Sequence, residues 1–477
     1  MESLVSALPA GGGAAAAAAA AGGLLAAAAL AGRAGLVGPR KNRSDAPPEQ
    51  KDETLKLFYF FHAAVPGLPL LGNLHQLKEK KPHQTFTKWA EIYGPIYTIK
   101  TGASSAVVLN STQVAKEAMI AKFSSISTRK LSKALSILTH EKTMVATSDY
   151  GDFHKMVKRF VMTSMLGTSG QKQFRDTRNM MIDNMLGTFH TLVNDDPNAP
   201  LNFREVFKNE LFRLSLIQAL GEDVSSVYVE EFEKVISKEE IYHATVVDMM
   251  IPVQARISYL DFLLEENTLT DEQLLMLVWE AVIEAADTTL VTTEWAMYEI
   301  AKHPEKQDRL YQEIQEVCGN DIVTEDHLSR LPYLNAVFHE TLRRHSPVPL
   351  VPPRFVHENT NLAGYEIPAG TEMIINLYGC NMNKNDWEEP EEWKPERFLD
   401  GRFETADMYK TMAFGAGRRA CAGSMQAMNI SCTAIARFVQ EFAWRLKEGD
   451  EDKADTIQLT TNRLYPLHVY LTPRARK

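Results

Sequence analysis

One cysteine of this chain stands in a setting that favours a reactive thiol. Cys421 belongs to the run FGAGRRACAG, from Phe414 to Gly423, and a long apolar stretch with helical periodicity follows it. The free N–H groups and the positive dipole end of a helix N-terminus favour a thiolate over a thiol. Gly417 and Gly423 leave the backbone open to a flat ligand, and Arg419 offers a positive charge to an acidic group on that ligand. The segment therefore predicts a thiolate beside a planar, acidic ligand.

Haem with a cysteine thiolate as its axial iron ligand meets these demands. Such a ligand pushes electron density onto the iron and favours cleavage of the O–O bond of dioxygen. Two alternatives stay open. Gly415, Gly417 and Ala420 also fit a dinucleotide-binding fingerprint, but that motif leads into a βαβ unit, and only 57 residues follow Ala420. The other alternative is a buried structural cysteine.

An acid and an alcohol stand next to each other in the middle of an apolar helical stretch. Leu274 to Ile300 contains neither Gly nor Pro and predicts one long, largely buried helix. Within it Glu284, Asp287 and Thr288 share one face. An acid–alcohol pair can hold water and pass protons there, and the Thr288 hydroxyl can bond back to the Glu284 carbonyl. The alternative is a helix edge that faces solvent, which the apolar neighbours of these residues disfavour.

A glutamate and two arginines form a second charged group. Glu340 and Arg343 are spaced to meet on one helical turn, and such a pair alone is usually a solvated ion pair of little energetic value. Arg397 follows in the motif PERF, inside a Trp- and Pro-rich stretch from Asn385 to Leu399. One glutamate shared between two arginines would form a buried network that locks this stretch against the helix.

The periodicity of the chain predicts a mainly α fold with small β-sheets. Helical periods dominate beyond residue 80, and no regular alternation of strands and helices indicates a doubly wound sheet. Besides the long helix, we expect helices at Gln307–Val317, Tyr333–Arg344 and Ala422–Trp444, and strands at Ile96–Lys100, Ser105–Leu109 and Met373–Leu377.

The composition is that of a large globular protein. The chain has 477 residues, of which 45% are hydrophobic and 23% charged, and this excludes a disordered chain. Its net charge of −10 argues against a nucleic-acid partner. The four cysteines include no C-x-x-C pair, which argues against a zinc finger and against a disulfide scaffold.

The N-terminal part predicts an anchor followed by a linker. No residue from Ser3 to Gly32 is charged, and this Ala- and Gly-rich run is long enough to span a bilayer. Basic residues follow it, so we expect the rest of the chain on the cytosolic side. We assign residues 1–36 to a weak membrane anchor, 37–64 to a linker and 65–477 to a catalytic domain that begins with a Pro-rich arm. A low-complexity tail or a cleaved transit peptide is the alternative for the first segment.

Together and in this order, the motifs resemble those of the cytochrome P-450 family of haem-thiolate monooxygenases. The resemblance covers residues 65–477 and includes the Pro-rich arm, the acid–Thr helix, E-x-x-R, PERF and F-x-x-G-x-R-x-C-x-G. It implies the P-450 fold, O2 as cosubstrate, and haem b as the cofactor, with its iron ligated by Cys421. It further implies a cofactor-binding loop with Phe414, Gly417 and Gly423, haem propionate partners in Arg419, Arg354, His154 and Lys158, an oxygen-activating pair in Asp287 and Thr288, and a structural triad of Glu340, Arg343 and Arg397.

Within that family the chain is similar to plant ent-kaurene oxidases. The similarity lies in FSSISTRKLSKAL at 123–135, TTLVTTEWAMYEI at 288–300 and HETLRRHSPVP at 339–349. It implies stepwise oxidation of one methyl group of the apolar diterpene ent-kaurene to the acid, on the gibberellin route, with electrons from an NADPH-dependent cytochrome reductase. It also implies an anchor in the endoplasmic reticulum or the plastid outer envelope. We expect the substrate to contact Ile283, Leu350 and Val351.

Phe153, where the family usually has Trp, and the Glu284–Ala285 pair, where it generally has Ala-Gly, are small departures from the family pattern, and a more serious one lies before the long helix. Between Met250 and Ser258 it passes directly from one family segment to the next, where the family has several dozen further residues that form much of the substrate roof. A truncated roof would admit water to the pocket and expose apolar core. The alternative to an active monooxygenase is therefore a haem-binding but inactive paralogue, or the product of a mis-spliced transcript.

Overall fold

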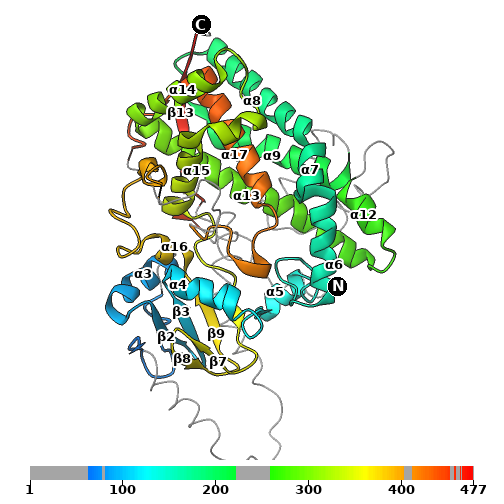
Figure 1. Cartoon of the computed structure of the whole chain (residues 1–477), viewed down its shortest axis with the longest axis vertical. Coiled ribbons are helices and arrows are strands. Elements are labelled where there is room, and N and C mark those ends of the chain that lie inside the picture. The colour runs from blue at the N-terminus through cyan, green and yellow to red at the C-terminus, as the bar shows by residue number, and fades with distance from the viewer. Residues whose placement is uncertain are drawn as a thin grey trace, which may run out of the picture.

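The molecule consists of a helical layer and a smaller β-rich part (Figure 1). In that view the helices lie above the region of β2, β3 and β9. The structure is a computed structural model of the whole chain and describes residues 63–77, 81–221, 258–401, 411–451, 456–457, 462–463 and 465–475. In these ranges helical residues far outnumber strand residues, so the expected mainly α fold with small β-sheets is confirmed.

The elements of the described residues are mostly short apart from a few long helices. The α-helices are α3 (Pro82–Tyr93), α4 (Thr112–Lys116), α5 (Lys133–Leu138), α6 (Asp152–Val161), α7 (Thr168–Gln173), α8 (Arg175–Asp195), α9 (Phe203–Leu220), α12 (Tyr259–Glu265), α13 (Asp271–Lys302), α14 (Pro304–Cys318), α15 (Pro332–His345), α16 (Leu377–Asn381) and α17 (Ser424–Glu441). The strands are β1 (Ala63–Ala64), β2 (Ile96–Thr101), β3 (Ser104–Leu109), β4 (Thr128–Arg129), β5 (Leu201–Asn202), β6 (Arg354–Phe355), β7 (Thr360–Leu362), β8 (Tyr365–Ile367), β9 (Glu372–Ile375), β10 (Phe442–Leu446), β11 (Thr456–Ile457), β12 (Asn462–Arg463) and β13 (His468–Pro473).

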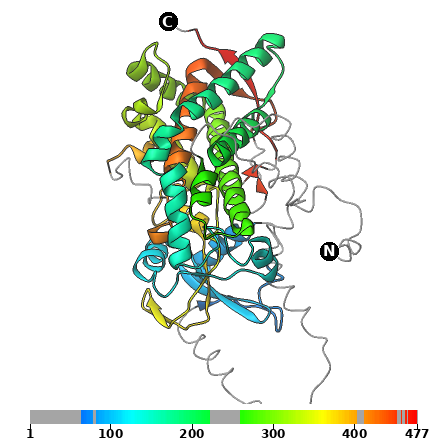
Figure 2. The same cartoon turned by 90° about the vertical axis from the view of Figure 1, so that its right-hand side faces the viewer.

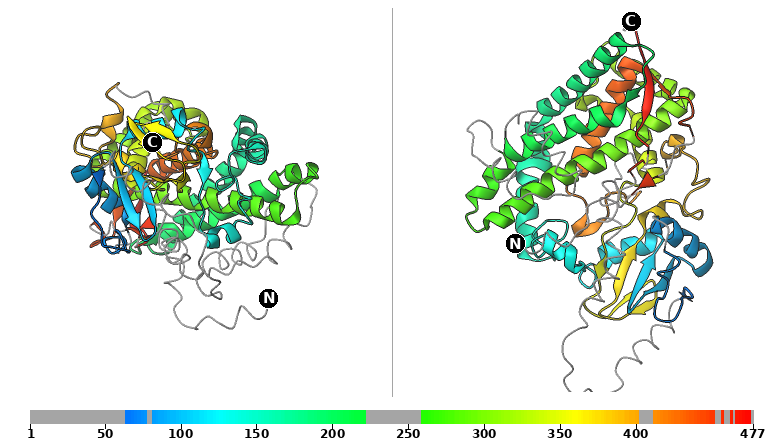
Figure 3. Two further views of the ribbon diagram at one scale, coloured as in Figure 1. Left: turned by 90° about the horizontal axis from the view of Figure 1, so that it is seen from below. Right: turned by 180° about the vertical axis from the view of Figure 1, so that it is seen from behind.

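The long helix α13 crosses the interior of the helical layer (Figures 2 and 3). Thr270 begins it with a capping box, in which the Gln273 N–H donates to the Thr270 hydroxyl at 3.3 Å and the Thr270 N–H donates to the Gln273 side chain at 3.0 Å. All residues from Thr289 to Ala301 are buried, and the helix packs against α9, α15 and α17. The expected long buried helix at 274–300 is confirmed, and so are those at 307–317 and 333–344, seen as α14 and α15.

The last long helix ends earlier than the periodicity predicts. α17 ends at Glu441, and Phe442 to Leu446 form strand β10, so the expected helix from Ala422 to Trp444 is wrong at its end. Every second residue of β10 is buried, and the strand pairs antiparallel with β13. Apolar residues continue from α17 into β10. The composition therefore does not reveal where the helical period of 3.6 gives way to the strand period of two.

The main sheet joins strands that lie far apart in the chain. Its six strands follow the order β1-β2-β3-β9-β6-β4. The strands expected at 96–100 and 105–109 are seen as β2 and β3, and they pair as an antiparallel hairpin. β3 pairs parallel with β9, which ends at Ile375, two residues before the predicted end. β1 pairs with Tyr97 and Thr98, so the sheet begins at Ala63, two residues ahead of the predicted start of the domain at residue 65.

Two predictions concern segments outside the described residues. The proposed anchor at 1–36 and nearly all of the linker at 37–64 lie there, and so does the shortened roof segment between Met250 and Ser258. Over the residues that the structure does describe, no helix has both the length and the apolar character needed to cross a membrane.

Truncation of the aromatic core of the helical layer should destabilise the protein. Phe189 on α8 is fully buried, and its ring centroid lies 5.3 Å from that of Phe438 and 5.7 Å from that of Trp444. We expect Phe189→Ala to lower the free energy of unfolding by about 3–5 kcal/mol, because the cavity left behind collapses only in part. Leu192→Ala, at a side chain on the same helix that is 43% exposed, should change it by less than about 1 kcal/mol. Equal urea-unfolding midpoints for the two variants would contradict this core.

Candidate cofactor site

Main-chain contacts hold the loop that carries Cys421. Gly417–Arg419 form a short 3-10 turn, and α17 begins at Ser424. The Cys421 N–H donates to the Phe414 carbonyl at 2.8 Å, and the Gly423 N–H donates to the Cys421 sulfur. The cysteine therefore stands directly before a helix N-terminus, as the sequence predicts.

The Cys421 sulfur faces an interior space. The residue is exposed, and yet its surroundings are dense enough that burial raises the pKa of its thiol to about 11. A group that is both accessible and desolvated lies in a recess and not on the outer surface. The Gly423 N–H and the Lys158 ammonium lower this pKa, but burial outweighs both. The main-chain N–H and the lysine thus favour the thiolate, as the sequence predicts, and a metal cation at the sulfur would supply the stabilisation that burial removes.

The two glycines of the loop serve different purposes. Gly417 has a φ of 70°, and a Cβ at this position would stand 2.4 Å from the Met119 carbonyl oxygen. This glycine is required by the close approach of the segment Glu117–Ala121 and not by a flat ligand, which corrects the sequence interpretation. A Cβ at Gly423 would have the Cys421 sulfur at 3.9 Å and Leu166 at 4.0 Å as its nearest described neighbours, so the backbone beside the sulfur is open.

Three arginines and a histidine form a buried positive cluster beside the loop. Arg129 of β4 lies opposite Arg354 of β6 in the sheet register, and Arg419 of the Cys421 loop repels both. Burial and this mutual repulsion hold the pKa of Arg129 well below its usual range and lower the pKa of Arg354 to about 10. Burial, with the charge of Arg419, also lowers the pKa of His154 to about 4.

Several buried polar atoms of this cluster have no hydrogen-bond partner within the described ranges. They are Nε of Arg354, Nε of Arg419 and Nε2 of His154. Other atoms of the same side chains are held, since His154 Nδ1 lies 3.0 Å from the Ser148 hydroxyl and Arg354 donates to the Ile126 carbonyl at 3.3 Å. Glu284 and Asp149 offset part of the charge of Arg129, and Asp149 part of that of Arg419, but burial still lowers the pKa of both arginines. Buried polar atoms without a hydrogen-bond partner are costly, and carboxylates of an acidic ligand would relieve that cost. The residues present thus fit the haem expected from the sequence, with its propionates at this cluster.

Lys158 hydrogen-bonds to the main chain of the Cys421 loop. Its ammonium donates to the carbonyls of Arg418 at 3.0 Å and Ala420 at 3.1 Å. It therefore holds the Cys421 loop from the side of α6, which differs from the expected contact with a propionate. Lys155 and Arg159 on the same helix are exposed, as a solvated basic face requires.

Arg129 is the residue of this cluster that the sequence analysis did not identify. It lies in the run at 123–135, where nothing marks one cation as buried. Its Nε donates to the Ala146 carbonyl at 3.1 Å, and its strand reaches the site by pairing with β6. This pairing joins segments far apart in the chain, and no local pattern predicts it.

One turn of α13 opens toward the same space as Cys421. Glu284 is exposed and Asp287 and Thr288 are half-buried, although the helix is fully buried from the next residue onward. The Thr288 hydroxyl donates to the Glu284 carbonyl at 3.2 Å, as the sequence predicts. The charge of Glu284 raises the pKa of Cys421 and acts on Arg129 as well, so the three side chains lie near one another. Glu284, Asp287 and Thr288 do share a face, and that face is the accessible one.

A second carboxyl precedes Glu284 by one turn. Glu280 is buried and accepts the N–H groups of Val145 at 2.6 Å and Ala146 at 2.7 Å. Burial and the charge of Glu284 raise the pKa of Glu280 well above its usual range. Burial raises the pKa of Glu284 too, while the charge of Arg129 lowers it.

The three expected substrate contacts do not all point to one place. Ile283 is half-buried on the accessible turn of α13. Val351 is 8% exposed and packs in an apolar cluster with Val107 and Met373, whereas Leu350 packs against a separate cluster on the sheet. Neighbouring residues of an extended segment face opposite sides, so the structure does not direct Leu350 and Val351 into one space.

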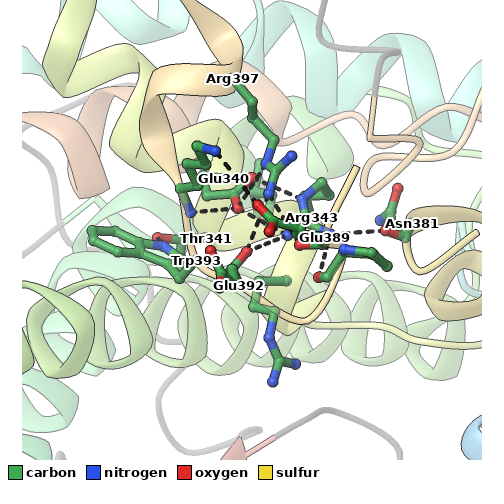
Figure 4. Close-up of polar contacts among 12 residues, drawn as sticks. Glu340, Thr341, Arg343, Asn381, Glu389, Glu392, Trp393 and Arg397 are labelled. Carbon is green, nitrogen blue, oxygen red and sulfur yellow. Dashed lines mark hydrogen bonds and ion pairs between the residues drawn. The ribbon is translucent and has the colours of Figure 1, made fainter. Parts of the chain in front are cut away.

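Glu340 lies between two arginines (Figure 4). Its carboxylate accepts Arg343 Nε at 2.7 Å, Arg343 Nη2 at 2.8 Å and Arg397 Nε at 3.1 Å. The Lys394 N–H adds a further bond at 2.8 Å. The side chains of Glu340 and Arg343 have no exposed surface, so this is a buried network and not a solvated ion pair.

The same network holds the irregular stretch that follows α16. Arg343 Nη1 donates to the carbonyls of Asn381 and Pro390, both at 2.9 Å, and Arg343 Nη2 donates to that of Glu392 at 3.0 Å. The Trp393 indole N–H donates to the Thr341 hydroxyl at 3.2 Å. Figure 4 shows these groups converging on α15. The stretch is therefore fixed by hydrogen bonds to one helical turn, as the sequence predicts.

Three comparisons relate the chain to known proteins. The family model for cytochrome P450 matches residues 64–209 and 200–467. Ent-kaurene oxidase 2 of Oryza sativa subsp. japonica is 68% identical, with 94% of this chain and 95% of the relative covered. Ent-sandaracopimaradiene 3-hydroxylase of the same species is 61% identical, with 87% and 91% covered. A structure of a zebrafish cytochrome P450 with abiraterone matches 83% of this chain and 100% of its own with a TM-score of 0.71, and at 20% identity it shows the fold alone.

The alignment with the first of these relatives also measures a deficit. It runs over 497 residues, more than the 477 of this chain, of which it uses 94%, or about 448. About 50 positions of the alignment therefore have no residue here. This deficit is similar in size to the several dozen residues expected to be missing between Met250 and Ser258, although that segment lies outside the described residues.

Removal of one cation from the buried cluster should weaken cofactor retention. We expect Arg129→Met to release haem about tenfold faster than the unaltered protein, because a buried charge-assisted hydrogen bond is lost. Arg129→Lys should restore part of the retention, and Lys133→Met, at an exposed side chain nearby, should leave it unchanged. Transfer of haem to an excess of a haem-scavenging protein, followed by absorbance, measures the rates. Equal rates for Arg129→Met and Lys133→Met would contradict the role of the cluster.

Neutralisation of Glu340 should unfold its surroundings. Glu340→Gln leaves two buried guanidinium groups without their shared counter-charge, and we expect a loss of about 3–5 kcal/mol in the free energy of unfolding. Glu391→Gln changes an exposed carboxylate in the same stretch and should have little effect. Thermal unfolding followed by circular dichroism compares the two variants, and a stable Glu340→Gln protein would refute the importance of the network.

Proposed function

This chain belongs to the cytochrome P450 family, and we propose that it oxidises a methyl group of ent-kaurene, or of a related diterpene, stepwise to the acid. As a member of this family it is a haem-thiolate monooxygenase that uses O2 and electrons from a redox partner. Its similar relatives are diterpene-oxidising enzymes, so its substrates are diterpenoids. The particular diterpene and the stepwise route to the acid are the proposal.

The observation that carries the proposal is the arrangement around the interior-facing sulfur. Cys421 would ligate the iron, the arginines Arg129, Arg354 and Arg419 would hold the propionates by charge and hydrogen bonds, and His154 would add a neutral ring nitrogen. Haem bound in this way supplies the activation of O2. The protein contributes a desolvated recess, which keeps water away from the reaction and strengthens each electrostatic contact.

The accessible turn of α13 supplies protons. Asp287 and Thr288 hold water on the accessible face of α13. The Thr288 hydroxyl is oriented by its hydrogen bond to the Glu284 carbonyl. A carboxyl and a hydroxyl placed next to each other can relay protons from bulk water to the recess without admitting a continuous water column.

Recognition of the hydrocarbon relies on shape. A diterpene such as ent-kaurene has no polar group, so apolar side chains such as Ile283, and either Leu350 or Val351, select it by burial alone. Discrimination between isomers of similar shape is therefore modest at the first oxidation step.

Electron supply and location complete the proposal. The electrons come from an NADPH-cytochrome reductase, and the exposed Lys155 and Arg159 offer positive charge to an acidic partner. Residues 1–36 anchor the chain in the endoplasmic reticulum or in the plastid outer envelope, with the catalytic domain facing the cytosol.

A haem-binding but inactive protein is the second candidate. The deficit of about 50 positions in the alignment favours it, since a roof that lacks these residues would leave the recess wet. Both candidates require the same haem site, so only turnover separates them.

The test combines a spectrum with turnover. We expect a reduced carbon-monoxide difference spectrum with the strongly red-shifted Soret band of a thiolate ligand, and conversion of ent-kaurene to its alcohol, aldehyde and acid with a plant reductase and NADPH. Cys421→Ala should abolish the shifted band. Thr288→Ala should keep it and lower the product formed per NADPH by about 100-fold, because the proton relay is broken. Thr191→Ala, at an exposed threonine on α8, is the matched control.

Three results would change the conclusion. A shifted band without turnover of any diterpene would leave the inactive haem protein as the function. A shifted band in Cys421→Ala would refute the assignment of the ligand. Normal coupling in Thr288→Ala would refute the proton relay.

A further inference from the structure

The carboxyl of Glu284 has no hydrogen-bonding role toward an apolar substrate. It is exposed on the accessible turn of α13, and within the described part of the chain no side-chain hydrogen bond satisfies its carboxyl oxygens. Its backbone carbonyl is already used by Thr288. A carboxyl in a desolvated recess is costly unless a partner with hydrogen-bonding capacity occupies the same space. The hydrocarbon ent-kaurene offers no such partner.

The charged groups around Glu284 come from three elements. Glu280 lies one turn before it on α13 and is itself fixed by the Val145 and Ala146 N–H groups. Arg129 faces it from β4 and favours its ionised form, whereas burial favours the neutral form. Cys421 of the loop is close enough for the charge of Glu284 to raise the pKa of its thiol. Glu284 shares the accessible face of α13 with Thr288, whose hydroxyl donates to the Glu284 carbonyl, so in the proposed function its carboxyl lies on the face where the substrate reacts.

The products of the proposed reaction differ from the substrate in polarity. The first oxidation converts C–H to C–OH and consumes one O2, two electrons and two protons, with one water released. The alcohol can donate a hydrogen bond to a carboxylate, and the aldehyde can accept one from the protonated form of the carboxyl. The final acid, once ionised, carries a negative charge that a second carboxylate repels. One carboxyl in the recess thus acts in opposite directions on the intermediates and on the end product.

We propose that Glu284 is a specificity-determining residue that binds the oxygenated intermediates and disfavours the acid product. This inference rests on the proposed function. The intermediate alcohol gains a hydrogen bond that ent-kaurene lacks, so it stays near the iron for the next oxidation instead of leaving. The ionised acid meets like charge and leaves. The side chain thereby favours completion of the sequence over release of the alcohol.

Substitutions separate the hydrogen bond from the charge. Glu284→Gln keeps hydrogen-bonding capacity and can never be ionised, whereas Glu284→Ala removes both. Equilibrium dissociation constants of ent-kaurene, its alcohol and its acid are measured at pH 8 by titration of the Soret band of the full-length haem protein. Glu272→Ala, at an exposed carboxylate at the start of the same helix, is the control.

The expected pattern is specific for each ligand. For the alcohol, Glu284→Ala should weaken binding about tenfold and Glu284→Gln should keep it within about threefold of the unaltered protein. For the acid, both variants should bind more tightly than the unaltered protein, by about three- to tenfold. For ent-kaurene itself, neither variant should weaken binding, and Glu272→Ala should change none of the three constants.

Two outcomes overturn the inference. Dissociation constants that shift by the same factor for all three ligands would show a structural role only. Constants that do not change in Glu284→Ala would show that the carboxyl does not reach the ligands. If the unaltered protein binds none of the three compounds, the proposed function fails together with the inference, and this result is distinct from binding that is insensitive to Glu284.

Discussion

The buried carboxylate of Glu340 is the contact on which the arrangement of the helical layer around the site depends. Two guanidinium groups and a main-chain N–H meet at its oxygens, and Arg343 also donates to the last carbonyl of α16 and to two carbonyls of the irregular stretch after it. Each of these charges can be buried only because the others neutralise it, so the ion pairs form together as one unit. Since α15 also packs against α13 and α17, the turn with Thr288 and the helix that follows Cys421 are positioned against the same fixed element.

The site combines this rigid support with polar groups that the described residues leave unsatisfied. Around Arg129, Arg354 and Arg419, in contrast to Glu340, like charges lie close together and buried N–H groups of Arg354 and Arg419 have no described acceptor. A fold rarely keeps such atoms unless a ligand completes them. Cys421 follows the same rule, because burial holds its proton until a cation takes the place of that proton. The Glu340 network thus keeps the recess folded, and the unsatisfied polar groups of the cluster allow it to bind a ligand.

The sequence predicts those parts of the structure that depend on local pattern. The α13 periodicity, the strands β2 and β3 and the spacing of Glu340 and Arg343 each lie within a short window, and the structure has all of them. Arg129 was missed because its place depends on a strand pairing between distant segments. The close approach of the Met119 carbonyl to Gly417 was missed for the same reason, since that carbonyl comes from another part of the chain. The burial that raises the pKa of the Cys421 thiol was missed because desolvation is a property of the assembled core and not of the motif.

The strand order has a consequence for the chain as it leaves the ribosome. β3 ends at Leu109, and its parallel partner β9 begins only at Glu372, so one edge of the hairpin lacks its neighbour through the synthesis of most of the protein. At about 5–20 residues per second this interval lasts roughly 13–50 seconds. An apolar strand edge that is open for so long is a site for pairing with the wrong chain. The first hairpin therefore stays open to such pairing until the segment that carries β9 has been synthesised.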